Sequence, residues 1–320
     1  MLAETRRVEF ARALLAWYDA NARDLPWRGG HDPYRIWISE IMLQQTRVAA
    51  VLEHYRLFLK EFPNLRKLAA AREGSVLAAW SGLGYYRRAR MLHAAAKLVV
   101  KEHAGRFPES SEGLRRLPGI GRYTAAAIAS IAFGEAVPVV DGNVERVLER
   151  LEGKRLAGEA VWQAATAMLD PKRPGDFNQS MMELGAMVCV PREPRCPLCP
   201  VAGFCATRGE LKSRVEVAPQ KKRAIQLGLA RRHGQVFIVQ RKQHESLMPG
   251  MWELPECADG FAGKTLLSLR HSITVTDYTV RVVEMPAPVG MDGEWISASR
   301  LGSLPLTGLA RKILRRVEMI

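Results

Sequence analysis

The chain has 320 residues, of which 48% are hydrophobic and 25% charged, and its formal net charge is +14. This apolar content excludes a disordered protein, and the length predicts about two domains. No run of about 18 apolar residues occurs, so we expect no membrane-spanning helix. The N-terminus lacks the continuous apolar stretch of a signal peptide, and we therefore expect a cytoplasmic protein. The positive charge indicates a polyanionic partner, most simply nucleic acid.

The excess charge is concentrated between two regions of different character. Residues 208–232 hold eight Lys and Arg but only two Asp and Glu, whereas the remaining C-terminal residues are nearly neutral. Up to about residue 226 this basic stretch shows no helical pattern. We therefore interpret residues 207–226 as a basic interdomain linker.

Apolar residues recur at three- and four-residue steps through the first 187 residues, which predicts helices. The expected helical segments are 8–20, 36–58, 76–80, 91–100, 124–132 and 161–169. After the linker, strand-like runs follow at 236–240, 272–275 and 278–285, and then a helix near 309–317. We expect a multidomain chain with an all-α body over 1–206 and an α+β domain over 227–320.

Four of the five cysteines fall within one short segment, as Cys189-x6-Cys196-x2-Cys199-x5-Cys205. Four thiolates this close can bind a tetrahedral zinc ion or an iron–sulfur cubane, and the spacing alone leaves both open. Disulfides are disfavoured by the expected compartment. Either metal group would stabilise a loop module with little apolar content of its own. We interpret the fifth cysteine, Cys257, as a small buried hydrophobe.

The segment LPGIGR at 117–122 lies between two expected helices. Gly119 and Gly121 allow a left-handed backbone and a close approach to a ligand. The N–H groups at the start of the next helix would then face a phosphate. A plain corner between helices fits the bare pattern as well, but Arg122 and two arginines just upstream favour phosphate binding. This is the helix-hairpin-helix pattern of DNA-binding proteins.

Two acidic residues stand out by their context. Glu40 lies in the expected helix 36–51, on a face shared with Leu43 and Gln44, where a solvated helix glutamate is the alternative. Asp141 follows a short apolar run and precedes a helix, so it fits a helix N-cap. The two interpretations of Asp141 are compatible, because a capping carboxylate held by N–H groups can also face a pocket.

Six motifs in register resemble the MutY-type adenine DNA glycosylases, which belong to the helix-hairpin-helix superfamily together with endonuclease III. The motifs are DLPWR (24–28), WISEIMLQQT (37–46), GLGYY (82–86), LPGIGRYTAAAI (117–128), DGNV (141–144) and the cysteine spacing. The resemblance covers about residues 20–205 and continues more weakly to the C-terminus. It implies a helix-hairpin-helix glycosylase body whose cysteine module, 189–205, holds a [4Fe–4S] cluster.

The family removes adenine mispaired with 8-oxoguanine, or with guanine, from double-stranded DNA and leaves an abasic site. The base must be flipped out of the duplex into a pocket. By resemblance, Glu40 is the general acid toward N7 of adenine and activates the water, while Asp141 stays ionised beneath the sugar. This chemistry requires a dry pocket that raises the pKa of Glu40 and hydrogen bonds that keep Asp141 charged.

The resemblance also assigns residues that contact the substrate and the DNA backbone. The substrate-binding residues would be Arg23, Trp27, Arg28, Leu43, Tyr123, Asn143, Gln179 and Met182, with Gln45 and Tyr85 near the opposing base. Phosphates near the lesion would be bound by Gly119, Gly121, Arg122, Arg87, Arg88 and Arg90. Considered alone, Trp27 and Leu43 would be core residues of a helical protein.

The main alternative is an endonuclease III-type enzyme that removes oxidised pyrimidines or mismatched bases and, in its bifunctional form, cuts the strand. That branch carries a lysine directly after the hairpin, which acts as a Schiff-base nucleophile. Here Tyr123 occupies this position, and no lysine occurs between Lys101 and Lys154. We therefore predict a monofunctional glycosylase.

Residues 237–255 resemble the Nudix-like domain of the same family. A Nudix hydrolase is the alternative, but its metal-binding cluster of glutamates is missing from 257–264. We therefore interpret the domain as a reader of the lesion. Ile273 and Thr274 align with the first two residues of the family's Phe-Ser-His triplet, which contacts 8-oxoguanine, while the histidine is absent. Ordinary strand residues are an equally good interpretation.

A DNA-binding scaffold without catalysis is a third alternative, which the presence of both Glu40 and Asp141 disfavours. We expect a monomer associated with the nucleoid that acts on double-stranded DNA and has no membrane partner. The basic linker would lie against the duplex, where its charge contributes affinity rather than specificity.

Overall fold

The structure is a computed structural model that describes residues 3–211, 220–258 and 260–320. Residues 212–219 of the predicted linker therefore lie outside the described residues. Within the described ranges, no helix is both long enough and apolar enough to span a membrane.

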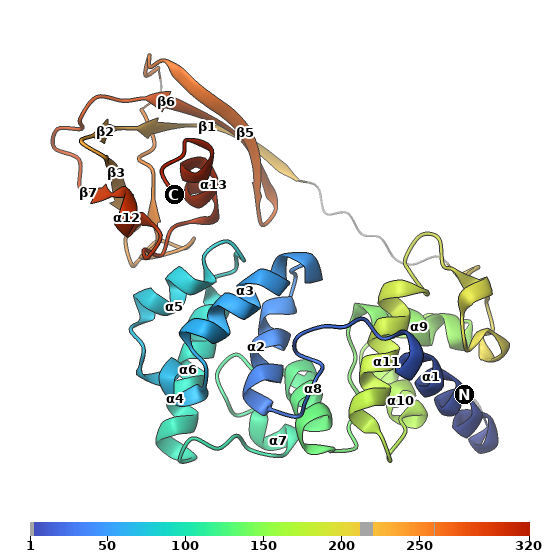
Figure 1. The fold of residues 1–320 in the computed structure, drawn as a ribbon. Coiled ribbons are helices and arrows are strands. Elements are labelled where there is room, and N and C mark those ends of the chain that lie inside the picture. Colours follow the sequence, from blue (N-terminus) through green and yellow to red (C-terminus); the bar gives the residue numbers. More distant parts are fainter. Residues whose placement is uncertain (1–2, 212–219, 259) are drawn as a thin grey trace. The chain divides into compact units, whose positions relative to one another are not determined.

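Two compact units make up the chain (Figure 1). The first contains Met1–Tyr55 and Ala95–Val215, and the second contains Arg56–Ala94 and Glu216–Ile320. The division between the units falls within two helices, α3 (Val48–Glu61) and α6 (Arg87–Glu102).

The first unit is helical in its described part, as predicted. Its remaining helices are α1 (Glu4–Asn21), α2 (Pro33–Leu43), α7 (Ser111–Leu114), α8 (Arg122–Phe133), α9 (Gly142–Glu152), α10 (Glu159–Met168) and α11 (Pro174–Met187). Two short 3-10 helices, η1 (Cys196–Leu198) and η2 (Ala202–Phe204), follow in the cysteine module.

The single helix predicted over 36–58 is wrong. The structure has two helices there, α2 and α3, which are separated at residues 44–47. Gln45 adopts a φ of 54°, a left-handed conformation that an α-helix cannot contain. The three- and four-residue spacing of apolar residues continues across residues 44–47, so the sequence pattern does not reveal the break. Glu40 therefore lies in the last turn of α2 rather than in the middle of a long helix.

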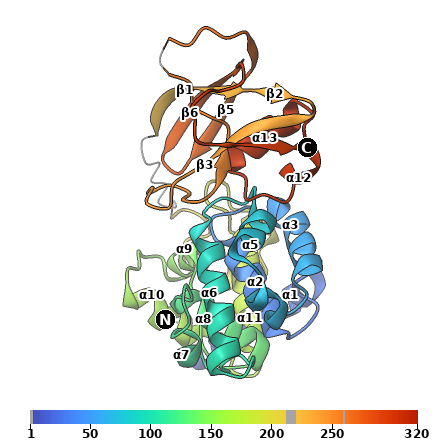
Figure 2. The same ribbon diagram turned by 90° about the vertical axis from the view of Figure 1, so that its left-hand side faces the viewer.

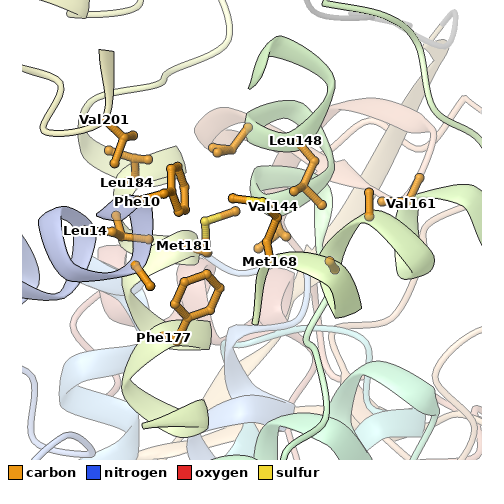
Figure 3. Close-up of a cluster of buried hydrophobic side chains, with 14 of the residues drawn as sticks. Phe10, Leu14, Val144, Leu148, Val161, Met168, Phe177, Met181, Leu184 and Val201 are labelled. Carbon is orange, nitrogen blue, oxygen red and sulfur yellow. The ribbon is translucent and has the colours of Figure 1, made fainter. Parts of the chain in front are cut away.

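Helices α1, α9, α10 and α11 share one hydrophobic core (Figure 3). Its members include Phe10 and Leu14 of α1, Val144 and Leu148 of α9, Val161 and Met168 of α10, and Phe177, Met181 and Leu184 of α11. Each fully buried side chain of this kind stabilises the fold by about 1.5–3 kcal/mol. The core fixes α11, which also carries predicted site residues.

Two glycines allow α11 to approach its neighbours closely. A Cβ placed on Gly185 would lie 2.6 Å from Cβ of Asn143 in α9. A Cβ on Gly175 would lie 2.7 Å from the carbonyl oxygen of Ser130 in α8. The backbone of α11 is therefore in direct contact with α8 near its start and with α9 near its end.

The second unit combines helices and strands. Its further helices are α4 (Leu65–Ala70), α5 (Glu73–Trp80), α12 (Ala298–Leu301) and α13 (Gly308–Arg316). Its strands are β1 (Lys221–Leu229), β2 (Arg231–Arg232), β3 (Gln235–Gln240), β4 (Trp252–Glu253), β5 (Thr265–Ile273), β6 (Thr276–Glu284) and β7 (Glu294–Ser297).

The described strands form two sheets. One has the order β1-β6-β5, in which β1 runs parallel and β5 antiparallel to β6, and Figure 2 shows these strands side by side. In the other sheet, β3 pairs with β2, β4 and β7. Inward residues such as Leu229, Val280 and Val282 share a core with Ile313 and Leu314 of α13. The α+β character predicted for the C-terminal region is confirmed.

Two expected boundaries in this region are wrong. Lys221 to Gln226, predicted as linker, form the first part of β1 and pair with β6. Their charged side chains are exposed, and a charged face does not prevent a strand from forming. The strand expected over 272–275 ends at Ile273, because Thr274 has a φ of 53° and turns the chain back into β6.

The close contact of α11 with α9 predicts the effect of one added methyl group. We expect Gly185→Ala to lower the free energy of unfolding by about 1–3 kcal/mol, because overpacking displaces Asn143. Gly142→Ala is the matched control, since a Cβ there meets nothing within 4 Å. Urea unfolding of both variants measures the difference, and an equally small effect of the two substitutions would contradict the close contact.

Candidate active site

Helix α2 brings Glu40 into the interior of the first unit. The side chain of Asp32 caps the helix by accepting a hydrogen bond from the Tyr34 N–H at 2.9 Å, and Pro33 follows as its first residue. All residues from Ile36 to Met42 are buried, and Glu40 is only 7% exposed. A carboxyl group with so little access to water needs a partner or a proton.

Tyr123, in the first turn of α8, is the partner of Glu40. Its Oη donates a hydrogen bond to Oε2 of Glu40 at 2.8 Å and lies 3.4 Å from Sδ of Met182. Burial, together with the charges of Glu40 and Asp141, raises the pKa of Tyr123 well above its ordinary value. The phenol therefore keeps its proton and orients the Glu40 carboxyl group.

Burial is also the main cause of the proton affinity of Glu40. It raises the pKa of Glu40 to about 7, and the charge of Asp141 contributes to the rise, whereas the Tyr123 hydrogen bond and the charge of Arg28 oppose it. A group that titrates near neutrality is well suited to donate and accept a proton in one catalytic cycle. The structure thus gives Glu40 the dry environment predicted for it.

Asp141 caps α9 at the end of an extended segment, 134–141. Its Oδ1 accepts hydrogen bonds from the N–H groups of Asn143 (2.9 Å) and Val144 (2.8 Å), and its Oδ2 accepts one from Asn143 Nδ2 (2.9 Å). These donors and the positive end of the helix dipole stabilise a negative charge. The predicted N-cap is confirmed, and the half-buried carboxylate remains close enough to Glu40 to influence its pKa.

The hydrogen bonds of Asp141 continue to the cysteine module. Oδ1 of Asn143 accepts a hydrogen bond from Nη2 of Arg146 at 2.8 Å. Nε of Arg146 in turn donates to the carbonyl oxygen of Cys189 at 2.8 Å. Asn143, predicted as a substrate-binding residue, therefore lies beside Asp141 and connects it to the start of the module.

A third acid, Glu183 on α11, is missing from the sequence predictions. Its side chain is 1% exposed, and its two oxygens accept hydrogen bonds from Nε (2.7 Å) and Nη2 (2.6 Å) of Arg23. Nη2 of Arg28 donates to the same carboxylate at 2.8 Å. Burial alone would raise the pKa of Glu183, but these hydrogen bonds to two arginines outweigh burial and lower the pKa to about 2. The sequence feature that could have indicated a buried role for Glu183 is its position next to Met182 in an otherwise apolar helical segment.

The other predicted pocket residues are placed differently from one another. Trp27 is buried, with its ring in edge contact with that of Tyr55 at 5.2 Å between centroids, so it packs as a core residue. Leu43 ends α2 and Gln179 lies on α11, both half-buried. Gln45 is exposed in the left-handed turn after α2.

The hairpin residues form the predicted turn between α7 and α8. Gly119 has a φ of 75°, which favours glycine, and Gly121 caps α8 without a side-chain hydrogen bond. Arg122 makes two hydrogen bonds to Glu159, at 2.6 and 2.9 Å, and stacks on Trp162 at 3.8 Å from the ring centroid. Its guanidinium is therefore held in place beside the hairpin.

In the second unit, Tyr85 is exposed with a φ of 49°. Arg88 lies over the rings of Trp80 and Tyr85 and donates to the carbonyl oxygen of Gly84 at 3.2 Å. Burial lowers the pKa of Arg88 to about 10. Arg90 pairs with Glu73 at 2.9 Å, and Arg87 is the exposed member of the three predicted arginines. Arg88 therefore supports the Tyr85 loop from within.

Ile273 and Thr274 lie at the turn between β5 and β6 in the same unit. Thr274 is exposed, and its Oγ1 donates to the carbonyl oxygen of Ile273 at 2.7 Å. Val275, which follows, is exposed as well. Ile273 is thus the last residue of a strand, whereas Thr274 lies in the turn that follows it.

The four cysteines of the module are free thiols and partly exposed. Burial, followed by the charges of Cys189 and Cys205, raises the pKa of Cys196. Burial raises the pKa of Cys199 to about 11, and its three companions contribute. The four sulfurs thus lie within electrostatic range of one another, and binding them as thiolates needs a cationic group.

The donor set of the module, four cysteine thiols, is of a kind that holds a zinc ion or an iron–sulfur cluster. Among the described residues, no three His, Cys, Asp or Glu side chains stand close enough to share a single metal ion. A cubane spreads its four thiolates over separate irons, so they need not meet at one point. Nη1 of the buried Arg150 donates to Sγ of Cys189 at 3.2 Å.

The raised pKa of Glu40 predicts a pH-dependent stability. The folded state binds the proton more tightly than the unfolded state, so the stability it contributes is complete below about pH 4.5 and lost as pH rises through about 7. We expect Glu40→Gln to gain up to about 3 kcal/mol over the parent at pH 8 and almost nothing at pH 4.5. Urea unfolding at both pH values measures this difference. Glu53→Gln, on an exposed position of α3, is the control, and parallel curves for both variants would contradict the assignment.

Comparison with known proteins agrees with this site. The family described as HhH-GPD superfamily base excision DNA repair protein matches residues 38–160. The adenine DNA glycosylase of Homo sapiens is 48% identical over 214 residues, which cover 62% of this chain and 39% of that protein. The adenine DNA glycosylase of Arabidopsis thaliana is 39% identical over 305 residues, which cover 80% of this chain and 48% of that protein. The chain thus spans less than half the length of these two relatives.

The chain also matches a solved structure over nearly all of that structure's length. The structure of a thermostable thymine-DNA glycosylase is 30% identical, with a TM-score of 0.61, and the match covers 65% of this chain and 98% of that chain. About two thirds of this chain therefore shares its fold with a known DNA glycosylase.

Proposed function

The chain belongs to the HhH-GPD superfamily of base excision DNA repair proteins, as a MutY-type member, and we propose that it is a DNA glycosylase that removes mispaired adenine. The observation that carries the proposal is the pair formed by Glu40 and Asp141. One carboxyl group is buried and titrates near neutrality, and the other receives three hydrogen bonds at a helix N-terminus. Hydrolysis of an N-glycosidic bond needs these two roles.

The reaction begins with a flipped adenine in the pocket. As the N-glycosidic bond breaks, its electron pair moves to the base and Glu40 protonates N7. The sugar develops positive charge at C1′, which the Asp141 carboxylate stabilises. Water then adds to C1′ and returns a proton to Glu40, so that free adenine and an abasic site are formed. Tyr123 orients Glu40 throughout and loses no proton.

The ion pairs of Arg23 and Arg28 with Glu183 hold these two predicted pocket residues in place. Arg23 and Arg28 are both held on Glu183, whose single negative charge offsets one of their two positive charges before any substrate arrives. Met182, which lies 3.4 Å from the Tyr123 hydroxyl, and Leu43, three residues after Glu40 in α2, are half-buried apolar residues near the site. An uncharged planar base suits such a pocket better than a phosphate does.

For the opposing base we infer 8-oxoguanine or guanine in double-stranded DNA. Gln45 in the first unit and, considered separately, Tyr85 and Thr274 in the second each have a left-handed backbone and an exposed position. Strained, exposed residues of this kind are concentrated in ligand-binding loops. The Nudix-like assignment of residues 227–320, the phosphate contacts of the arginines and the monomeric state belong to the same proposal.

A [4Fe–4S] cluster is the cofactor we infer, held by Cys189, Cys196, Cys199 and Cys205. When bound, it supplies structural cross-links to the loop and no step of the base excision. Arg150 would stabilise the thiolate of Cys189, and Arg146 would hold the carbonyl of the same residue.

Single-turnover excision tests the proposal. Duplexes with adenine opposite 8-oxoguanine, adenine opposite guanine, thymine opposite guanine, and thymine glycol separate it from the endonuclease III-type alternative. We expect free adenine from the first two duplexes and no base release from the others. Glu40→Gln should slow adenine release by at least about 100-fold while binding to the same duplex is retained. Absence of adenine release by the parent protein would refute the proposed activity.

The position of Tyr123 makes a separate prediction about strand cleavage. A phenol that is hydrogen bonded to Glu40 cannot form a Schiff base with the abasic sugar, because it has no amine. Borohydride added during turnover should therefore trap no covalent protein–DNA complex at this position. Tyr123→Lys is the informative variant, and trapping by the parent protein equal to that by the variant would contradict monofunctional chemistry.

A further inference from the structure

The segment that delivers Asp141 has little regular structure of its own. Residues 134–141 form neither helix nor strand, and they range from exposed at Gly134 and Ala136 to buried at Val139. Backbone N–H and C=O groups buried in this way need hydrogen-bond partners. Near the start of the segment, the N–H of Val137 reaches the carbonyl oxygen of Glu135 at 2.8 Å.

The partner for the next part of the segment is a side chain, Asn178 of α11. Its Oδ1 accepts the N–H of Val139 at 3.0 Å, and its Nδ2 donates to the carbonyl oxygen of Val137 at 2.8 Å. One carboxamide thus pairs with residues i and i+2 of an extended chain, as a neighbouring strand would. The segment is clamped two residues before Asp141.

The orientation of this carboxamide is fixed. The second hydrogen of Asn178 Nδ2 is donated to Oγ of Ser130 in α8 at 3.0 Å, and an exchange of the oxygen and nitrogen would break both bonds to the backbone of the segment. Asn178 is 3% exposed, and Ser130 and Val139 are also buried. The close approach of Gly175, three residues earlier, allows the side chain to reach both α8 and the segment.

Asp141 is consequently held from two sides. The N–H groups at the start of α9 bind its carboxylate, and the Asn178 clamp sets where the backbone enters the cap. We propose that Asn178 is a positioning residue, which places the Asp141 carboxylate for the chemical step and contributes little to DNA binding. This inference rests on the proposed adenine excision.

A positioning role has a consequence that a merely structural role lacks. The groups that face Glu40 are Tyr123 of α8, Arg28 of the preceding loop, and Asp141. Of these, the charge of Asp141 raises the pKa of Glu40. If the clamp is lost and Asp141 moves away, the pKa of Glu40 falls, and the rate should decline at a lower pH than in the parent protein.

The experiment compares three variants of the full chain. Asn178→Leu has a similar volume and removes all three hydrogen bonds, whereas Asn178→Asp keeps an acceptor for the Val139 N–H. Ser180→Ala is the matched control, because Ser180 is buried on the same helix and its Oγ donates only to the carbonyl oxygen of Phe177, at 2.7 Å. Single-turnover adenine excision is measured from pH 5 to 9, together with the Kd for the same duplex.

We expect Asn178→Leu to slow excision by about 100-fold, the effect of a displacement of about 1 Å at a reacting centre. Its Kd should stay within about threefold of the parent value and its decline in rate should move to lower pH. Asn178→Asp should give an intermediate rate, which keeps the test informative if the leucine variant does not fold. Ser180→Ala should match the parent in rate and pH profile.

Three results would overturn the positioning role. These are a parental rate for Asn178→Leu, a loss of DNA affinity as large as the loss of rate, or a slowed reaction with an unchanged pH profile. All three presuppose that the parent protein releases adenine. A parent that releases none refutes the proposed function itself, so the two failures are distinguishable.

Discussion

The close packing of α11 against α8 and α9 is the constraint on which the active site depends. Only glycine fits at Gly175 and Gly185, where the helix meets Ser130 and Asn143. Asn143 is bonded to Asp141, and Ser130 is bonded to the side chain that clamps the segment before it. Both ends of one helix therefore hold the same carboxylate. Because the middle of α11 lies in the hydrophobic core, the core and the chemistry share a single rigid element.

Glu40 and Glu183 show how hydrogen-bond and charge partners decide whether a buried acid has a raised or a lowered pKa. Glu40 and Glu183 are both deprived of water, yet the pKa of the first rises to about 7 and that of the second falls to about 2. Two guanidinium groups outweigh the desolvation of Glu183, whereas one neutral phenol does not outweigh that of Glu40. Asp141 is bound by backbone N–H groups, which remain in place whatever the substrate does. The site therefore separates a proton donor from a fixed charge.

Local signals in the sequence predicted the helical body, the hairpin and the cap formed by Asp141, because each has a short pattern with a direct physical cause. The break at Gln45 was missed, since a left-handed residue leaves the apolar period unchanged. Glu183 was missed because its arginine partner Arg23 is 160 residues away in the chain. The charged residues at the start of β1 predict a linker because they face solvent, and only their pairing with β6 reveals a strand.

Glu40 is the residue at which stability and function are opposed. Its neighbours Ile38, Ile41 and Met42 are apolar and buried, and an apolar residue in its place would spare the fold a desolvated charge above neutral pH. The rest of α2 compensates, with a capped first turn and a nearly continuous buried surface. A carboxyl group that weakens the fold at the pH where it titrates is best explained by the reaction it serves, because its hydrogen-bond partner, the Tyr123 hydroxyl, could equally donate to an uncharged acceptor there.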